Sequence, residues 1–345
     1  MGGLRILAVA AALVATAGLT ACGGGHARPA PSTAPTSVVP PRAADNSAAG
    51  AVGADLVVGD QLRPLGGSPV GLPGSGTVYS AHKLPDGWLV ERGDKGMRKL
   101  WLVTTTGSKL LVDFVDNGYS IGADGRHLAY QQGNWLTVGV IGSGKVIVQS
   151  RTQLPGKDGS QGRSGAVLTG WAGEFLVIGN RVGVDYEGFD VWDPSRGGYS
   201  PTFNKDVYGI FGAPPAGGSL LGAVAVGADR HPCLASLDPS AGLRASNVNC
   251  AVPVHPSYGW LSPDARHLAA WMRDTFTVYE LASGTVAASV PYQGVGVPTW
   301  IDGSTVVVPQ KDKLIRLDLG DPKHPQELPL PDPGGQWLVV ARIGN

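Results

Sequence analysis

The sequence predicts an all-β fold built from repeats of one four-stranded unit, on three observations. A short strand, a polar turn with glycine and a second strand recur six times along the chain. Before each copy comes another hairpin pattern, such as YSIGADGRHLAY (119–130), with a turn rich in Pro, Asp or Gly. The composition of 52 Gly and 27 Pro suits many short strands and turns. The repeated turns contain Gly107, Gly144, Gly197, Gly242, Gly284 and Gly320, which follow one another at 36 to 53 residues.

Two hairpins in each unit give four strands, and units of this length built from strands are typical of propeller blades. The two ends of the chain supply the closing unit. PDPGGQWLVVARIG (331–344) repeats the first half of a unit, and DLVVGDQLRPL (55–65) repeats the second half. A ring must close because an open blade leaves unpaired strand edges. We therefore expect a β-propeller over residues 54–345, with seven four-stranded blades and a composite closing blade. Six blades with a capping strand, or eight blades, are the alternatives.

Parts of these units resemble known repeats. LSPDARHLAAW (261–271) and IGADGRHLAY (121–130) resemble the WD40-like repeats of TolB-type bacterial propellers. FDVWDP (189–194) resembles the Trp-Asp ending of a WD repeat. The resemblance covers most of residues 55–345 and implies the fold. It implies no single function, because this architecture hosts binding scaffolds, hydrolases, lactonases and oxidoreductases.

Residues 1–21 have the pattern of a signal peptide. Arg5 precedes an apolar run from Ile6 to Gly18. Leu19-Thr20-Ala21-Cys22 then resembles a bacterial lipobox. The resemblance implies that the Cys22 thiol receives a lipid and that Cys22 becomes the new N-terminus after cleavage. An ordinary secretory signal and an uncleaved anchor are the alternatives.

Residues 22–53 are dominated by Pro, Ala, Ser, Thr and Gly, and no apolar face can form in them. This composition predicts a flexible tether between the lipidated Cys22 and the propeller. Several acyl chains make membrane anchoring stable. The sequence therefore predicts a protein anchored by lipid to a cell membrane, on its extracytoplasmic face.

The remaining cysteines, Cys233 and Cys250, flank the predicted hairpin turn at 238–242. Two antiparallel strands meeting at that turn would place the cysteines nearly opposite each other. An oxidising compartment favours a disulfide between them. A pair of buried free thiols is the alternative.

The charges and motifs exclude several function classes. Lys and Arg number 27, Asp and Glu also number 27, and no basic stripe suggests a nucleic-acid partner. No nucleophile elbow, zinc-protease, phosphate-binding or CxxC motif occurs in the chain. We therefore expect no catalytic residues, no metal site and no cofactor. We also expect a monomeric propeller.

The loops that join one blade to the next are the expected binding site, because they converge at the mouth of a propeller. Tyrosines stand one step before several predicted inner strands, and polar residues come just ahead of them. A ring of tyrosines with convergent polar groups would suit a polar ligand or a peptide. The alternative is that these tyrosines pack between blades. The candidate residues are Asp116, Asn117, Tyr119, Asn204, Asp206, Tyr208, His255 and Tyr258.

These observations predict a membrane-tethered binding or assembly scaffold for an envelope protein or a surface ligand. A propeller hydrolase or lactonase with a metal in its channel is the alternative. It would need several carboxylates, Asn or His on the inner strands, where the sequence places mostly Gly, Ser, Ala, Ile and Trp. A redox quinoprotein would need clustered Arg, Asp and Trp along the axis, and no such cluster can be assembled from the sequence.

Overall fold

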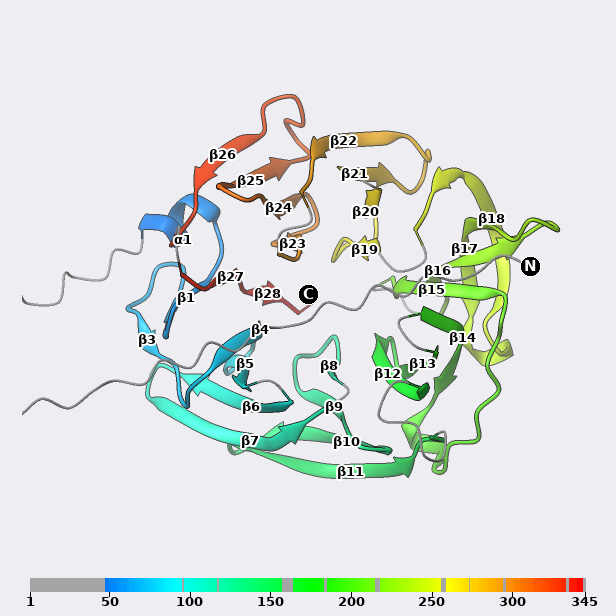
Figure 1. Ribbon diagram of the computed structural model, residues 1–345, viewed down its shortest axis with the longest axis horizontal. Helices are drawn as coiled ribbons and strands as arrows, with labels where there is room; N and C mark the ends of the chain where they lie inside the picture. Colours follow the sequence, from blue (N-terminus) through cyan, green and yellow to red (C-terminus); the bar gives the residue numbers. More distant parts are fainter. Residues whose placement is uncertain are drawn as a thin grey trace, which may run out of the picture. The chain divides into compact units, whose positions relative to one another are not determined.

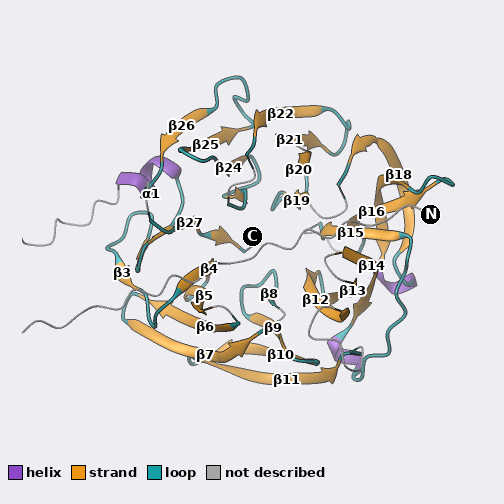
Figure 2. Cartoon of the chain, in the orientation of Figure 1, coloured by secondary structure: helices purple, strands orange, loops and turns teal. Residues whose placement is uncertain are grey.

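The computed structural model describes residues 47–94, 96–116, 118–156, 164–182, 185–214, 218–255, 259–272, 274–293, 296–332 and 335–343. Cys22, Asn117 and Tyr258 lie outside these ranges, as do the signal peptide and the tether before residue 47. Seven sheets follow one another around a ring, and the last labelled strand lies at its centre (Figure 1). Strands supply nearly all of the regular structure (Figure 2). The chain is a seven-bladed β-propeller, as the repeats predict.

The first two blades show the regular pattern, in which each strand pairs antiparallel with the next. A middle strand of each blade is largely buried (residues 87–94 in blade 1 and 135–142 in blade 2), whereas the outermost strand of each is mostly exposed. Blade 1 holds β4 (Thr77–Leu84), β5 (Gly87–Asp94), β6 (Met97–Thr104) and β7 (Gly107–Val115). Blade 2 holds β8 (Tyr119–Ile121), β9 (His127–Gln132), β10 (Trp135–Gly142) and β11 (Lys145–Gln153).

Blade 3 departs from the expected four regular strands. Only three strands form its hydrogen-bonded ladder. The fourth position is held by an isolated bridge between Phe189 and Asn204. The segment before Asn204 contains Pro194 and Pro201, and proline has no N–H to donate to a ladder. Blade 3 holds β12 (Ser164–Ala172), β13 (Phe175–Val182) and β14 (Asp185–Trp192), followed by a short 3-10 helix, η1 (Pro194–Arg196).

Blades 4 to 6 return to four strands each. Blade 4 holds β15 (Val207–Gly212), β16 (Leu220–Val226), β17 (His231–Asp238) and β18 (Arg244–Pro253), with a 3-10 helix η2 (Pro239–Ala241) in its last turn. Blade 5 holds β19 (Gly259–Leu261), β20 (His267–Met272), β21 (Thr275–Glu280) and β22 (Val286–Pro291). Blade 6 holds β23 (Thr299–Trp300), β24 (Thr305–Pro309), β25 (Lys313–Asp318) and β26 (Gln326–Pro329).

Blade 7 is the expected composite of both termini, with a different division of strands. The N-terminal part supplies three strands, and the C-terminal part supplies only the innermost one. Leu56, Val57 and Val58 pair with Val339, Leu338 and Trp337, respectively. A half-and-half division was wrong because Val70 and Gly71 add a third N-terminal strand beside Leu62 and Gln61, and because residues 341–342 pair with blade 1 instead. Blade 7 holds β27 (Trp337–Val339), β1 (Leu56–Val58), β2 (Gln61–Arg63) and β3 (Val70–Gly71).

The final strand, β28 (Ala341–Arg342), leaves blade 7 and adds a fifth strand to blade 1. It runs parallel to β4, with Ala341 opposite His82 and Arg342 opposite Lys83. Figure 1 shows it at the centre of the ring. The C-terminal end of the described chain therefore occupies the central channel.

One short helix, α1 (Ser47–Val52), precedes β1. Ala49 and Val52 are buried and share a cluster with Ile301 of blade 6 and Leu56 of blade 7. Part of the segment predicted as tether is therefore packed against the propeller, through Ala49 and Val52. No helix in the described ranges is long and apolar enough to cross a membrane.

The core is divided into seven clusters, one between each pair of neighbouring blades. Between blades 5 and 6, for example, Phe276 and Val290 pack with Val306 and Leu317. Each blade is thus buried on both faces, which explains strands that are buried throughout, such as β24. Blade 7 contributes to two clusters and joins the first blade to the sixth.

A disulfide joins Cys233 of β17 to Cys250 of β18, with Cα atoms 4.4 Å apart. This confirms the expected pairing across the hairpin. Cys233 is fully buried, and the bridge fixes the exposed outer strand to the interior of blade 4.

Replacing both cysteines by alanine is expected to lower the free energy of unfolding by about 3 kcal/mol. A bridge between residues 17 positions apart restricts the unfolded chain by roughly that amount. Urea unfolding followed by circular dichroism measures the difference. Dithiothreitol should destabilise the parent and leave the double variant unchanged. Equal sensitivity of the two proteins to the reductant would contradict the prediction.

Candidate functional site

The connections between strands form two faces of the ring. The loop face contains the loops between consecutive blades and the turns between second and third strands. The turn face contains the turns between first and second strands and between third and fourth strands. This division follows from the alternating strand directions in each blade. The binding residues expected from the sequence that lie in the described ranges belong to loop-face connections or lie next to them.

Tyr119 begins β8 and lies between blades 1 and 2. Its hydroxyl shares a hydrogen bond of 2.7 Å with the Ser80 hydroxyl, which donates to Glu91 at 2.8 Å. Its ring meets the edge of the His82 ring at a centroid distance of 5.7 Å. Burial raises the pKa of the phenol above its usual range. Tyr119 is therefore held mainly by contacts inside the propeller, in the inter-blade position given above as the alternative.

Asp116 is also engaged in local structure. One carboxylate oxygen accepts a hydrogen bond of 2.7 Å from the Gly133 N–H, which fixes a loop-face turn of blade 2. The Asp116 carbonyl accepts a bond of 2.9 Å from Arg98, whose guanidinium also pairs with buried Glu91 at 2.8 Å. Arg98 lies over the exposed ring of Tyr79 at 5.6 Å. Asp116 and Tyr119 are thus linked through Arg98 and Glu91.

Asp206 and Tyr208 form a second cluster, around Arg230. The guanidinium of Arg230 donates to the Tyr208 hydroxyl at 2.6 Å and to the Asp206 carboxylate at 3.3 Å. A third bond of 2.8 Å reaches the Lys205 carbonyl. Asn204 points elsewhere, and its amide donates to the carbonyls of Gly242 and Leu243 in blade 4. Sequence reasoning missed Arg230, although its place in the turn before β17 puts it on the loop face.

Three candidates remain: His255, Asn117 and Tyr258. His255 follows β18 on the loop face and is half-buried. Asn117 and Tyr258 lie outside the described residues. Tyr119 and its partners belong to blades 1 and 2, whereas Arg230 and its partners belong to blade 4 and the loop before it. The structure therefore brings the candidates together in two groups on different blades.

The largest group of hollows lies on the turn face. Four of them, of about 560, 600, 740 and 640 Å³, share lining residues in the turn that follows β8. This turn spans residues 122–126 and touches all four hollows. Together they form a recessed surface over blade 7 and blades 1 to 5, which we call the turn-face recess. Another hollow, of about 450 Å³, opens on the loop face between blades 6, 7 and 1.

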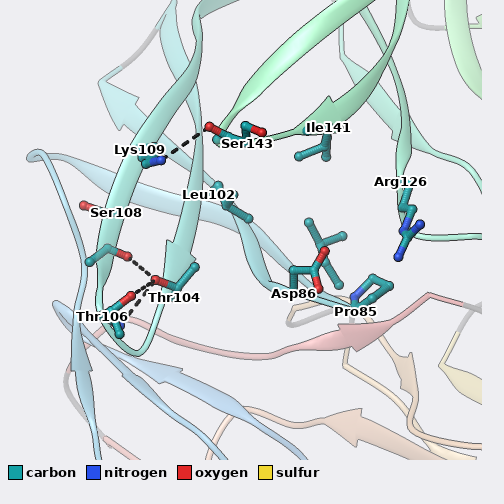
Figure 3. A pocket seen from close by; sticks show the side chains of 15 residues that line it. Pro85, Asp86, Leu102, Thr104, Thr106, Ser108, Lys109, Arg126, Ile141 and Ser143 are labelled. Carbon is teal, nitrogen blue, oxygen red and sulfur yellow. Dashed lines mark hydrogen bonds between the residues drawn. The ribbon is translucent and has the colours of Figure 1, made fainter.

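Figure 3 shows the hollow of the turn-face recess that lies between blades 1 and 2. Thr104 and Thr106 share a hydroxyl hydrogen bond at one end of it, and Arg126 lies at the other. Lys109 donates to the Ser143 carbonyl at 3.3 Å and links the last turns of both blades. The exposed side chain of Arg126 has no hydrogen bond or ion pair among the described residues. The hollow between blades 1 and 2 therefore offers hydroxyl groups and cationic side chains to a partner.

The central hollow, of about 640 Å³, follows the inner strands along the axis of the ring. Half-buried aromatic side chains from four blades line it: Tyr119, Trp171, Phe211 and Trp260. The C-terminal residues Ala341, Arg342 and Ile343 form part of its wall. Its described lining contains one imidazole, that of His82, and no carboxylate. Groups of three or more metal-ligating side chains close enough to hold an ion do not occur in the described ranges.

The inner-strand segments LTGW, GIFG and GWLS carry three of these aromatic residues. In the sequence they indicate a poor metal-ligand set. The same residues could have indicated an apolar channel, because the innermost strand of a blade faces the axis. Among the described residues of the expected set, Tyr119 alone lines the central hollow.

Burial lowers the pKa of His82 to about 4, from the usual 6.5. The unfolded chain would take up this proton near pH 6.5, and the folded chain only near pH 4. The stability that the protein gains by burying neutral His82 is fully present above the unfolded pKa of 6.5. It is lost as the pH falls toward the folded pKa of about 4.

We expect the parent to lose about 2 kcal/mol more stability than His82→Gln between roughly pH 7 and pH 4.5, because the variant cannot take up the proton. Urea unfolding at the two pH values measures this difference. Equal losses in both proteins would show that His82 does not cause the pH dependence.

No protein-family model matches the chain, and no curated protein matches it. Among solved structures, AztD from Citrobacter koseri is 11% identical over 84% of this chain and 98% of its own, with a TM-score of 0.47. BamB from Moraxella catarrhalis is 12% identical over 73% and 76%, with a TM-score of 0.44. A chain of hydrazine synthase from Kuenenia stuttgartiensis is 14% identical over 71% and 77%, with a TM-score of 0.44. These similarities concern the fold alone and assign no ligand to this chain.

Proposed function

We propose that this chain is a binding scaffold, held at the outer face of a cell membrane by a lipid on Cys22, and that its turn face binds an envelope protein. The observation that carries the proposal is the turn-face recess, which extends over six blades. A rigid ring with a broad indented face suits protein recognition, because little ordering of the scaffold is needed on binding.

The chemistry of the turn-face recess favours a protein partner. Aromatic residues and arginine are enriched where protein interfaces are buried. Trp171 lines two of the hollows, and Arg126 stands exposed at the edge of a third. Asp86 and Asp124 add carboxylates to the turn-face recess, which also carries the cationic Arg126. A partner with both apolar side chains and charges of both signs would match this surface.

The predicted tether supports a partner close to the membrane. The described chain begins at α1, which packs beside Ile301 in the first turn of blade 6, on the turn face. About 25 residues lie between Cys22 and α1, and a flexible linker of that length spans on the order of 28 Å. The tether would thus enter the propeller from the face that carries the recess.

Photo-crosslinking in cells tests the binding face. A crosslinking amino acid is placed at Arg126 on the turn face, at Asp206 on the loop face and at Arg151 on the outer strand of blade 2. We expect one specific protein partner from Arg126 and none from the two matched exposed positions. A partner captured only from Asp206 or Arg151, or no partner at all, would contradict the proposed face. Stoichiometric metal in the purified protein would instead favour the alternative function, a propeller hydrolase or lactonase with a metal in its channel.

The anchor has a separate test. Cys22→Ser should shift the protein from the detergent phase to the aqueous phase in a detergent-partition assay, because the lipid cannot be attached. Mass spectrometry of the parent should find acyl chains on Cys22. An unmodified N-terminal peptide in the parent would contradict the lipid anchor and leave the scaffold proposal to the crosslinking result.

A further inference from the structure

The central hollow has the size of a small-molecule site. Its volume of about 640 Å³ falls within the range of roughly 300–1,000 Å³ typical of ligand pockets. It lies on the axis of a closed ring, where strands from several blades hold its walls. A ligand would meet a preformed site there.

The walls suit a flat apolar group. Trp171, Phe211 and Trp260 come from blades 3, 4 and 5. Each packs its buried side against a different inter-blade cluster and remains partly exposed. Aromatic rings prefer stacked or edge-on contact with other rings, which adds to the gain from burying apolar area.

The charge of the hollow suits an anion. Arg342 is the one charged residue in its described lining, because burial keeps His82 neutral. The exposed guanidinium of Arg342 has no hydrogen bond or ion pair among the described residues. Arg342 also lines an adjoining hollow, in which two carboxylates already have hydrogen-bond donors. There Asp55 accepts from Trp88, and Asp124 accepts from His127.

The backbone fixes the position of this cation. β28 pairs with β4, so that Arg342 stands opposite Lys83 at the inner edge of blade 1. Ile343 packs against the cluster between blades 1 and 2 and holds the strand on its other side. A charge pair formed beside apolar walls is screened less than one in open water.

We propose that the central hollow binds a small aromatic carboxylate, with its ring among Trp171, Phe211 and Trp260 and its carboxylate on Arg342. The central hollow is the innermost part of the turn-face recess, and the proposal goes beyond the scaffold function because the ligand is a small molecule whose binding needs no protein partner.

Isothermal titration calorimetry on the full chain in neutral detergent tests the site with a matched pair of probes. 2-Naphthoate and 2-naphthamide have the same flat body and differ in charge. We expect 2-naphthoate to bind at least tenfold more tightly than the amide, and added NaCl to weaken only the acid. Arg342→Gln should remove this preference, whereas the control Arg151→Gln on the outer strand of blade 2 should retain it.

Each other outcome overturns the proposal. Equal binding of acid and amide, or no binding of either, would mean that the hollow does not select an aromatic anion. A preference that survives in Arg342→Gln would place the anion elsewhere. Octanoate binding as tightly as 2-naphthoate would show that the walls do not select a flat ring. If Arg342→Gln does not melt like the parent, the salt dependence of the parent with the two probes decides.

Discussion

Deletion of residues 336–345 should abolish cooperative unfolding of the propeller, whereas deletion of residues 341–345 alone should leave it folded. The longer deletion removes β27, the innermost strand of blade 7. The shorter one removes β28, which is an added fifth strand in a blade that is complete without it.

The physical reason is the closure of the ring. β27 supplies the only partner of the inner edge of β1, through three residue pairs. Val339 and Val340 are almost fully buried and belong to the clusters on either side of blade 7. The Val340 N–H also donates to the Asp55 carbonyl at 3.0 Å. Without β27, two of the seven core clusters lose buried side chains, and an unpaired strand edge faces the channel.

Circular dichroism melting and limited proteolysis of the two truncated chains measure this effect. We expect no sharp transition and rapid cleavage after the longer deletion, and a transition within a few degrees of the parent after the shorter one. A parent-like melt of the longer deletion would show that blade 7 does not need its C-terminal strand. Loss of folding in both would assign an essential role to β28.

Arg92→Met should lower the free energy of unfolding by about 3 kcal/mol, through loss of a buried network. Arg92 lies in β5, and its side chain is only 4% exposed. Its guanidinium donates to the carbonyls of Gly76, Leu72 and Pro73 in the loop between blades 7 and 1. It also pairs with Asp60, in a turn of blade 7. Methionine keeps the apolar volume and leaves these carbonyls without their donor.

Two controls separate this network from a simple ion pair. Asp60 is 80% exposed, so Asp60→Asn should cost less than about 1 kcal/mol. Arg151→Met, on the exposed outer strand of blade 2, should cost still less. Urea unfolding gives all three values. Equal costs for Arg92→Met and Asp60→Asn would mean that the ion pair, not the carbonyl network, carries the stabilisation.

The sequence predicts the strands and turns well because both depend on local chemistry. The turn glycines and the apolar runs recur in each unit and place most strands within a few residues. The Cys233–Cys250 disulfide follows from the same reasoning, since a hairpin turn fixes which residues face each other. Composite closure follows from the half-units at both ends of the chain.

The candidate site was less predictable, because it depends on which side chains share one space. Tyr119 begins an inner strand next to a loop between blades, close to where the sequence places it, but its hydroxyl is bonded to Ser80 of blade 1. Arg230 was absent from the expected set because its turn has no signature, and its role follows only from the approach of Tyr208 and Asp206.

The sequence by itself determined a closed ring of β-blades, its disulfide and the expectation of a lipid tether. Tertiary structure alone decided that only one strand of the C-terminal part completes blade 7 and that the next one enters the channel. It also decided that the central hollow, with its aromatic lining, forms the innermost part of the turn-face recess. The reason is that sequence patterns report which face of a strand is buried. The packing of seven twisted sheets decides which buried or exposed side chains meet.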